Sequence, residues 1–132
     1  MYDVLVAIDD DEERALAQAR AIADLPGAAD GVTVHLCHVF RDNPEGASVN
    51  QLAAVRRASE ALNEAGIAYD HYEASGDPGE EIVAAAEAID ADAICLSGRK
   101  RRPSGKAVFG SVTQNVILQS DRPVFAVPKG DD

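Results

Sequence analysis

The residues best suited to bind a ligand lie between positions 97 and 113, where a basic stretch leads into a helix-like segment. Positions 99–106 hold five Arg and Lys side chains and no acid, a local charge of +5. The other 124 residues hold 7 basic and 23 acidic side chains, a sum of −16. The connection is also longer than the roughly 2–6 residues usual between elements of an α/β domain. Both features indicate that this segment meets an anionic partner or a nearby acidic patch.

Gly110, Ser111 and Thr113 predict a phosphate site at the start of the helix that follows. A helix N-terminus offers unpaired N–H groups and a partial positive charge to a phosphate. A glycine lets the phosphate approach the backbone, and the two hydroxyl groups can hydrogen-bond to it. Two alternatives stay open: Ser111 serves only as a helix cap, or the basic run is a solvated tip that pairs with acids of a neighbouring subunit.

The acidic residues at positions 9–13 follow the first apolar run of the chain. Asp10 and Asp11 are typical of a helix start, where carboxylates meet the positive end of the helix dipole. Asp9 ends the strand instead. Its carboxylate is the candidate ligand for a Mg2+ ion that accompanies a nucleotide, because hard oxygen ligands and substrate phosphates suit that ion.

The His and Cys residues form no catalytic or metal-binding pattern. His35 and His38 are expected to have packing roles on opposite faces of a buried strand, because no Ser or Cys nucleophile pattern accompanies them. Cys37 and Cys95 lie in apolar runs without metal-ligand spacing, which indicates buried, reduced thiols and a cytoplasmic location. The phosphate-loop patterns G-x4-G-K-[S/T] and G-x-G-x-x-G are also absent.

Apolar runs of strand length alternate with segments of helical periodicity along the chain. Strands are expected at 3–8, 32–40, 67–74, 93–96 and 124–127, and helices begin near positions 10, 48, 77 and 111. The third run alternates in a way that predicts a partly exposed edge strand. This order predicts an α/β fold with an open parallel sheet and helices on both faces. The length predicts a single domain, residues 1–132.

Two of the helix starts carry capping patterns. Asp77, Pro78 and Glu80 combine a capping Asp, a proline at the first helical position and a Glu at the reciprocal capping site. Ser48 and Gln51 have the form of a capping box. These patterns locate the beginnings of two helices more firmly than hydrophobic periodicity alone.

The net charge of −11 restricts the class of function. A free-standing nucleic-acid binder needs a broad basic surface, so that class is disfavoured. Asp exceeds Glu by 14 to 9, Arg exceeds Lys by 9 to 3, and aromatic residues make up 5% of the chain. We associate this balance with proteins that work in concentrated salt, as in a halophilic archaeon, where screening reduces self-repulsion. No apolar window reaches the length of a membrane span, and no secretory signal is expected.

Several segments of the chain resemble the universal stress protein family. They are residues 4–9, 36–39, 76–82, 110–116 and 121–128. The resemblance covers essentially the whole chain. It implies a five-stranded parallel sheet in the order 3-2-1-4-5, as in adenine-nucleotide alpha-hydrolase-like folds. It also implies a homodimer, often formed through the last strands.

Many members of that family bind ATP with a motif G-x2-G-x9-G-[S/T] around the phosphates. The resemblance implies that Asp9 lies at the ligand-facing end of the first strand and that the backbone of Val39 contacts the adenine. The residues it implies for the phosphates are Gly110, Ser111, Val112 and Thr113.

The first half of that motif differs in this chain. Counting back from Gly110 places Ser97 at the first glycine and Lys100 at the second, with Gly98 one position late. A side chain at the second glycine obstructs backbone contact with a phosphate, or else Arg99 and Lys100 supply charge where the family supplies bare N–H groups. Both alternatives stay open.

The leading hypothesis is a cytoplasmic, homodimeric stress protein that binds ATP, with Mg2+ bridging Asp9 and the phosphates. The nucleotide would order the 97–110 loop and so act as a switch. No residue provides a general base, so at most slow hydrolysis is expected. The alternative is a dimeric module that binds no nucleotide and whose basic loop meets another anion or a protein. An ATP pyrophosphatase of similar architecture is disfavoured, because the expected Ser-Gly-Gly phosphate loop does not follow the first strand.

Overall fold

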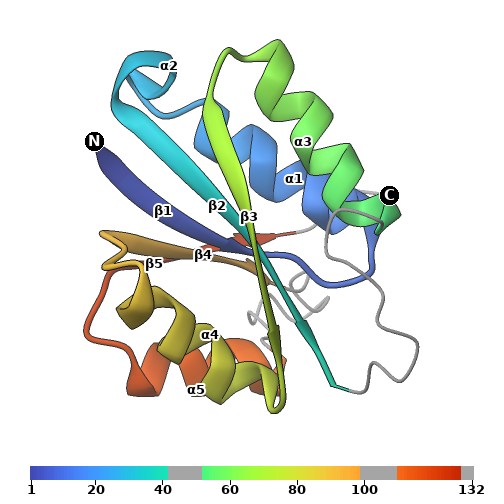
Figure 1. Ribbon diagram of the computed structural model, residues 1–132, viewed down its shortest axis with the longest axis vertical. Helices are drawn as coiled ribbons and strands as arrows, with labels where there is room; N and C mark the ends of the chain where they lie inside the picture. Colours follow the sequence, from blue (N-terminus) through green and yellow to red (C-terminus); the bar gives the residue numbers. More distant parts are fainter. Residues whose placement is uncertain (42–51, 99–109, 129–132) are drawn as a thin grey trace, which may run out of the picture.

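The protein is described by a computed structural model that covers residues 1–41, 52–98 and 110–128 (Figure 1). Its centre is a five-stranded sheet in the order β3-β2-β1-β4-β5. The strands are β1 (Tyr2–Ala7), β2 (Val32–Phe40), β3 (Ala68–Ser75), β4 (Ala93–Gly98) and β5 (Val124–Pro128). Every neighbouring pair is parallel, so the predicted fold class, strand order and strand direction are confirmed.

Helices cover both faces of the sheet, as right-handed connections between parallel strands require. They are α1 (Glu12–Ala23), α2 (Ala28–Gly31), α3 (Ala53–Glu64), α4 (Pro78–Ala88) and α5 (Ser111–Gln119). Figure 1 shows α1 and α3 on one face and α4 and α5 on the other. Val4 and Val6 of β1 pack into the first layer and Leu5 into the second, because successive strand residues point to opposite faces. None of the helices in the described ranges is long and apolar enough to cross a membrane.

The central strand β4 and the edge strand β3 differ in how deeply their side chains are buried. Residues 93–96 of β4 are all buried. In β3, by contrast, Tyr69 and Tyr72 are half-buried, while Asp70 and His71 are exposed. The prediction of a partly exposed edge strand is therefore confirmed.

Capping residues explain where two helices begin. Asp77 accepts a hydrogen bond from the backbone N–H of Glu80 at 3.1 Å, and Pro78 is the first helical residue, so the predicted start of α4 is confirmed. Asp11 caps α1 in the same way, accepting from the backbone N–H of Arg14 at 3.0 Å. Acidic side chains at these two helix starts satisfy backbone donors that would otherwise lack partners.

Two details of the helices differ from the sequence-based expectation. The short helix α2 was not predicted, because four residues are too few to show a helical period. It follows Gly27, whose φ of 71° lies in the left-handed region that favours glycine. The helix α3 begins after Leu52, its N-cap residue. The predicted capping box at Ser48 and Gln51 lies outside the described residues.

Candidate functional site

A pocket of about 650 Å3 opens at the carboxyl edge of the sheet, where β1, β2 and β4 end. The helix that follows β1 along the chain, α1, covers one face of the sheet, and the helix that follows β4, α5, covers the other, so the chain switches faces between these two neighbouring strands (Figure 1). Ligands of open α/β sheets bind at such a switch point. The volume lies within the roughly 300–1,000 Å3 typical of small-molecule sites.

The pocket lining is mostly apolar and comes from both helical layers. Its apolar residues include Ala7, Val39, Phe40, Leu52, Ile82, Leu96 and Val112. The charged residues among its lining are Asp9, Asp10 and Arg41. A cleft with an apolar wall and a few charged groups at its rim suits a ligand that has a flat apolar part and a polar end.

The structure brings most of the predicted site residues to this edge of the sheet. Those that line the pocket are Asp9, Val39, Ser97 and Val112. The others in the described ranges stand at the end of β4 and the start of α5: Gly98, Gly110, Ser111 and Thr113. Arg99 and Lys100, with the rest of the basic stretch, lie outside the described residues.

The start of α5 differs from the starts of α1 and α4. Gly110 is its N-cap residue and Ser111 its first helical residue, so the alternative in which Ser111 is the cap is wrong. Gly110 has no side chain to accept from the first-turn N–H groups, whereas Asp11 and Asp77 cap the other two helices. No capping side chain therefore competes with a ligand for the positive end of α5.

Thr113 joins α5 to the neighbouring strand. Its hydroxyl group donates to the backbone carbonyl of Ser97 at 3.1 Å, and the residue is only 5% exposed. The hydroxyl hydrogen is thus already engaged, although the prediction gave this hydroxyl to a phosphate. In this arrangement Thr113 positions the helix start against the pocket wall.

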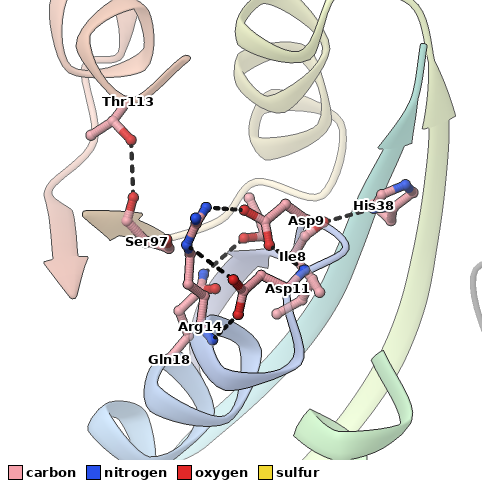
Figure 2. A network of polar contacts seen from close by, with 9 residues as sticks. Ile8, Asp9, Asp11, Arg14, Gln18, His38, Ser97 and Thr113 are labelled. Atoms are coloured by element: carbon pink, nitrogen blue, oxygen red, sulfur yellow. Dashed lines mark hydrogen bonds and ion pairs between the residues drawn. The ribbon is translucent and has the colours of Figure 1, made fainter. Parts of the chain in front are cut away.

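Asp9 is held by two hydrogen bonds at the end of β1 (Figure 2). Its Oδ1 accepts from the backbone N–H of Asp11 at 2.9 Å, and its Oδ2 accepts from Nη1 of Arg14 at 3.1 Å. Arg14 was not predicted as a site residue. The one indication in the sequence is its place within the first helical turn after the acidic run, which puts its long side chain within reach of the strand end.

The described residues do not form a ready Mg2+ site. No group of three or more His, Cys, Asp or Glu side chains in the described ranges could hold a metal ion. The predicted ligand, Asp9, already has its Oδ2 on the guanidinium of Arg14. A metal ion at that oxygen would have to displace a positive charge that belongs to the chain.

Gln18 links the two strands β1 and β4, both of which end at the pocket, and this role was also missed. Its side chain is fully buried, and Nε2 donates to the carbonyl of Ala7 at 2.8 Å and to that of Cys95 at 3.3 Å. The paired register of β1 and β4 runs only as far as Val6 and Cys95. The Gln18 amide therefore bridges the two strands where they diverge. Its Oε1 has no hydrogen-bond partner among the described residues.

His38 lines the pocket and stabilises the end of β1. Its Nδ1 lies 2.7 Å from the carbonyl oxygen of Ile8, so this nitrogen must carry the proton and donate. The ring packs edge-on against Phe40, with centroids 4.5 Å apart. These contacts confirm the predicted packing role.

His35 lies away from the pocket, between two carboxylates. Its Nε2 is 3.0 Å from Oδ1 of Asp3, and its Nδ1 is 2.7 Å from Oδ1 of Asp70. Burial lowers the pKa of His35, but the hydrogen bonds and charges of the two carboxylates outweigh it, so the pKa is raised above 6.5. His35 thus links β1, β2 and β3, and its two carboxylate partners favour the protonated ring.

Both cysteines are buried free thiols, as predicted. Burial raises the pKa of Cys37 and of Cys95 to about 12, although contact with Gln18 acts in the opposite direction for Cys95. The thiolate is the nucleophilic form of cysteine, and it is not populated near neutral pH at such values. Cys37 therefore forms part of the pocket wall rather than a nucleophile.

Comparison with known proteins identifies the family. A family model described as the universal stress protein family matches residues 1–128. A universal stress protein of Mycolicibacterium smegmatis is 34% identical over 67 residues, which are 50% of this chain and 52% of that protein. The stress response protein NhaX of Bacillus subtilis is 40% identical over 52 residues, 39% of this chain and 31% of that protein. The matched segments span about half or less of these curated relatives.

Solved structures share the fold over nearly the whole chain. A universal stress protein from Archaeoglobus fulgidus has a TM-score of 0.76 and 28% identity and covers 96% of this chain and 98% of its own. The universal stress protein from Archaeoglobus fulgidus in complex with dAMP has a TM-score of 0.72 and 23% identity, with the same coverage. A family protein from Arabidopsis thaliana with AMP bound has a TM-score of 0.74 and 15% identity and covers 100% of this chain and 94% of its own.

Proposed function

The chain belongs to the universal stress protein family, and on this premise we propose that its pocket binds an adenine nucleotide. The observation that carries the proposal is an apolar pocket beside a helix N-terminus whose cap residue has no side chain. The apolar wall suits the base, and the helix N-terminus attracts the phosphate. The relatives described with dAMP and with AMP bound share this fold, which supports the same class of ligand.

In the proposed arrangement the base lies against the backbone of Val39, and Asp9 faces the ligand from the end of β1. The phosphates lie at the start of α5. The residues proposed to surround them are Ser97, Gly98, Arg99, Lys100, Gly110, Ser111, Val112 and Thr113. Thr113 would contribute its backbone N–H, because its hydroxyl group donates to a carbonyl of β4.

The form of the nucleotide is part of the proposal. The Gly110-Ser111 sequence favours ATP, as the resemblance implied. Mg2+ would accompany ATP and bind Asp9 only after Arg14 leaves the outer oxygen of that carboxylate. No residue in the described ranges is placed as a nucleophile or general base, so we propose binding as the function and no dedicated catalysis.

The proposed role is a switch in the cytoplasm. Nucleotide binding would change the surface around residues 97–110, which partners would read. A homodimer through the last strand is part of this proposal. In the described part of the chain β5 pairs with β4 alone, which leaves its other edge open to a second copy. Leu118 of the adjacent helix is 82% exposed and would be covered in such a pair.

Isothermal titration calorimetry tests the binding. Adenosine, AMP and ATP would each be titrated into the protein with Mg2+ and with EDTA, and GMP would serve as the control for the base. We expect saturable heat with the adenine ligands and much weaker heat with GMP. No heat at millimolar adenine nucleotide would overturn the proposal.

The alternative is a stress module that binds no nucleotide and uses its basic stretch on another anion or a protein. One sequence feature favours it, the replacement of the two motif glycines by Ser97 and Lys100. Under this alternative, calorimetry with adenine nucleotides gives no heat, while a polyanion or an acidic peptide still binds in a salt-dependent way.

A further inference from the structure

Building on the proposed nucleotide site, we infer that Arg14, and not a divalent cation, supplies the positive charge that holds the phosphate nearest the nucleoside. Arg14 is tied to the rim of the pocket through Asp9, which lines it: Nη1 donates to Oδ2 of Asp9 at 3.1 Å. Its Nε lies 3.7 Å from Oδ2 of Asp11. The carboxylates of Asp9 and Asp11 thus hold the guanidinium of Arg14 next to the pocket (Figure 2).

The guanidinium keeps donors for a ligand. Toward the described residues Arg14 uses Nη1 and Nε, and its second terminal nitrogen, Nη2, makes no hydrogen bond to any of them. The side chain is 35% exposed, and Arg14 lies outside the pocket lining, directly beside Asp9, which is part of it. In the view of Figure 2 the guanidinium projects between Asp9 at the end of β1 and Ser97 at the end of β4, and both line the pocket. A planar guanidinium can bond a carboxylate with one edge and a phosphate with another.

The acidic side chains around Asp9 favour a cation beside the phosphate. Asp9 and Asp10 line the pocket, and Asp11 follows directly. Arg41 also lines the pocket, but Arg14 is the cation that contacts Asp9 and Asp11. A phosphate beside three carboxylates would be repelled unless a positive charge stood between them. Mg2+ often supplies that charge at nucleotide sites, but at Asp9 it would compete for the oxygen that Arg14 already holds. Because Arg14 is permanently charged and already placed, AMP binding needs no metal ion.

Adenosine and AMP provide the sharpest comparison, since they differ only in the phosphate. Calorimetry at fixed ionic strength would measure both ligands on the wild type, Arg14→Gln and Arg14→Lys, each in EDTA and in Mg2+. We expect the wild type to bind AMP equally well in EDTA and in Mg2+. Arg14→Gln should weaken AMP about tenfold or more, the cost of one charged hydrogen bond, and leave adenosine unchanged. Arg14→Lys should retain part of the AMP affinity.

A second readout uses the carboxylate of Asp9, which loses its guanidinium partner in Arg14→Gln. In Arg14→Gln the outer oxygen of Asp9 is released, so Mg2+ should restore part of the AMP affinity, and adding Asp9→Asn should abolish that restoration. Thermal unfolding would show that each variant is folded. If Arg14→Gln does not fold, Arg14→Lys provides the test. The inference then predicts that Arg14→Lys loses affinity for AMP but keeps its affinity for adenosine.

Several results would overturn the inference. If the wild type binds AMP in Mg2+ but not in EDTA, the inference about Arg14 is wrong, while the proposed nucleotide binding is still supported. Equal AMP affinity in the wild type and Arg14→Gln would also overturn the inference, as would equal weakening of adenosine and AMP, which would mark a structural role. Failure of the wild type to bind either ligand would remove the proposed function and this inference together.

Discussion

The hydroxyl group of Thr113 donates to the backbone carbonyl of Ser97 across 3.1 Å and so ties the first turn of α5 to the end of β4. Thr113 is 5% exposed, so water does not replace this bond easily. Ser97 lines the pocket, and α5 begins beside it. The bond therefore holds the proposed phosphate-binding helix start at a fixed place relative to the pocket wall.

Replacing Thr113 by valine tests this bond. The variant keeps the shape of the side chain but leaves the Ser97 carbonyl without its partner, so we expect a loss of about 1–2 kcal/mol in the free energy of unfolding. Thr113→Ser is the matched control, because it keeps the hydroxyl group and loses only a methyl group. Urea denaturation would measure both. A valine variant that is as stable as the serine variant would show that the bond contributes nothing.

Gln18 offers a test of the link between β1 and β4. Gln18→Met removes the amide that donates to Ala7 and Cys95, and we expect it to cost about 1–3 kcal/mol. Gln18→Glu should cost more at neutral pH, because a buried carboxylate would face two carbonyl oxygens. Its pKa would be raised by burial, so its stability should fall further behind the wild type as the pH rises. Urea midpoints across pH would check this. The same deficit at every pH would contradict the assigned contacts.

The sequence allowed the elements to be predicted more fully than the site. Both ends of β2 and the start of α5 were predicted, because an apolar run and a glycine before a helix are local features. Arg14 and Gln18 were not predicted, since their roles depend on partners that folding brings close. Gln18 bonds the carbonyl of a residue 77 positions away, which hydrophobic periodicity does not reveal. The direction of the Thr113 hydroxyl group likewise depends on a tertiary contact, because its acceptor Ser97 lies in another element.

His35 gives the fold a pH dependence whose sign is set by its two carboxylate partners. Because its pKa in the folded protein is raised above 6.5, its contribution to stability is fully present below pH 6.5 and is lost as the pH rises through the folded value. His35→Gln should lack this decline. Urea denaturation of both proteins from mildly acidic to alkaline pH would show it. Parallel pH profiles for the two proteins would contradict the raised pKa of His35.

Gly110 tests where the phosphate binds. Its φ of −71° is accessible to any residue, so Gly110→Leu should fold while its side chain obstructs the start of α5. We expect AMP affinity to fall by more than about tenfold. Gly31→Ala, compared with Gly110→Ala, is the control, because a Cβ added at Gly31 meets no atom within 4 Å and Gly31 lies outside the pocket lining. Unchanged AMP binding by Gly110→Leu would show that the phosphate does not bind at the start of α5.

The most direct test of the proposed adenine-nucleotide site is a nuclear magnetic resonance titration of the nitrogen-15-labelled protein with AMP. The binding site predicted here should show the largest amide shifts at Asp9, which follows β1, at Val39 in β2 and at Ser111, the first residue of α5. Asp70, on the edge strand and away from the pocket lining, should not shift. Shifts confined to β3 or α2, or none at millimolar AMP, would contradict the proposed site.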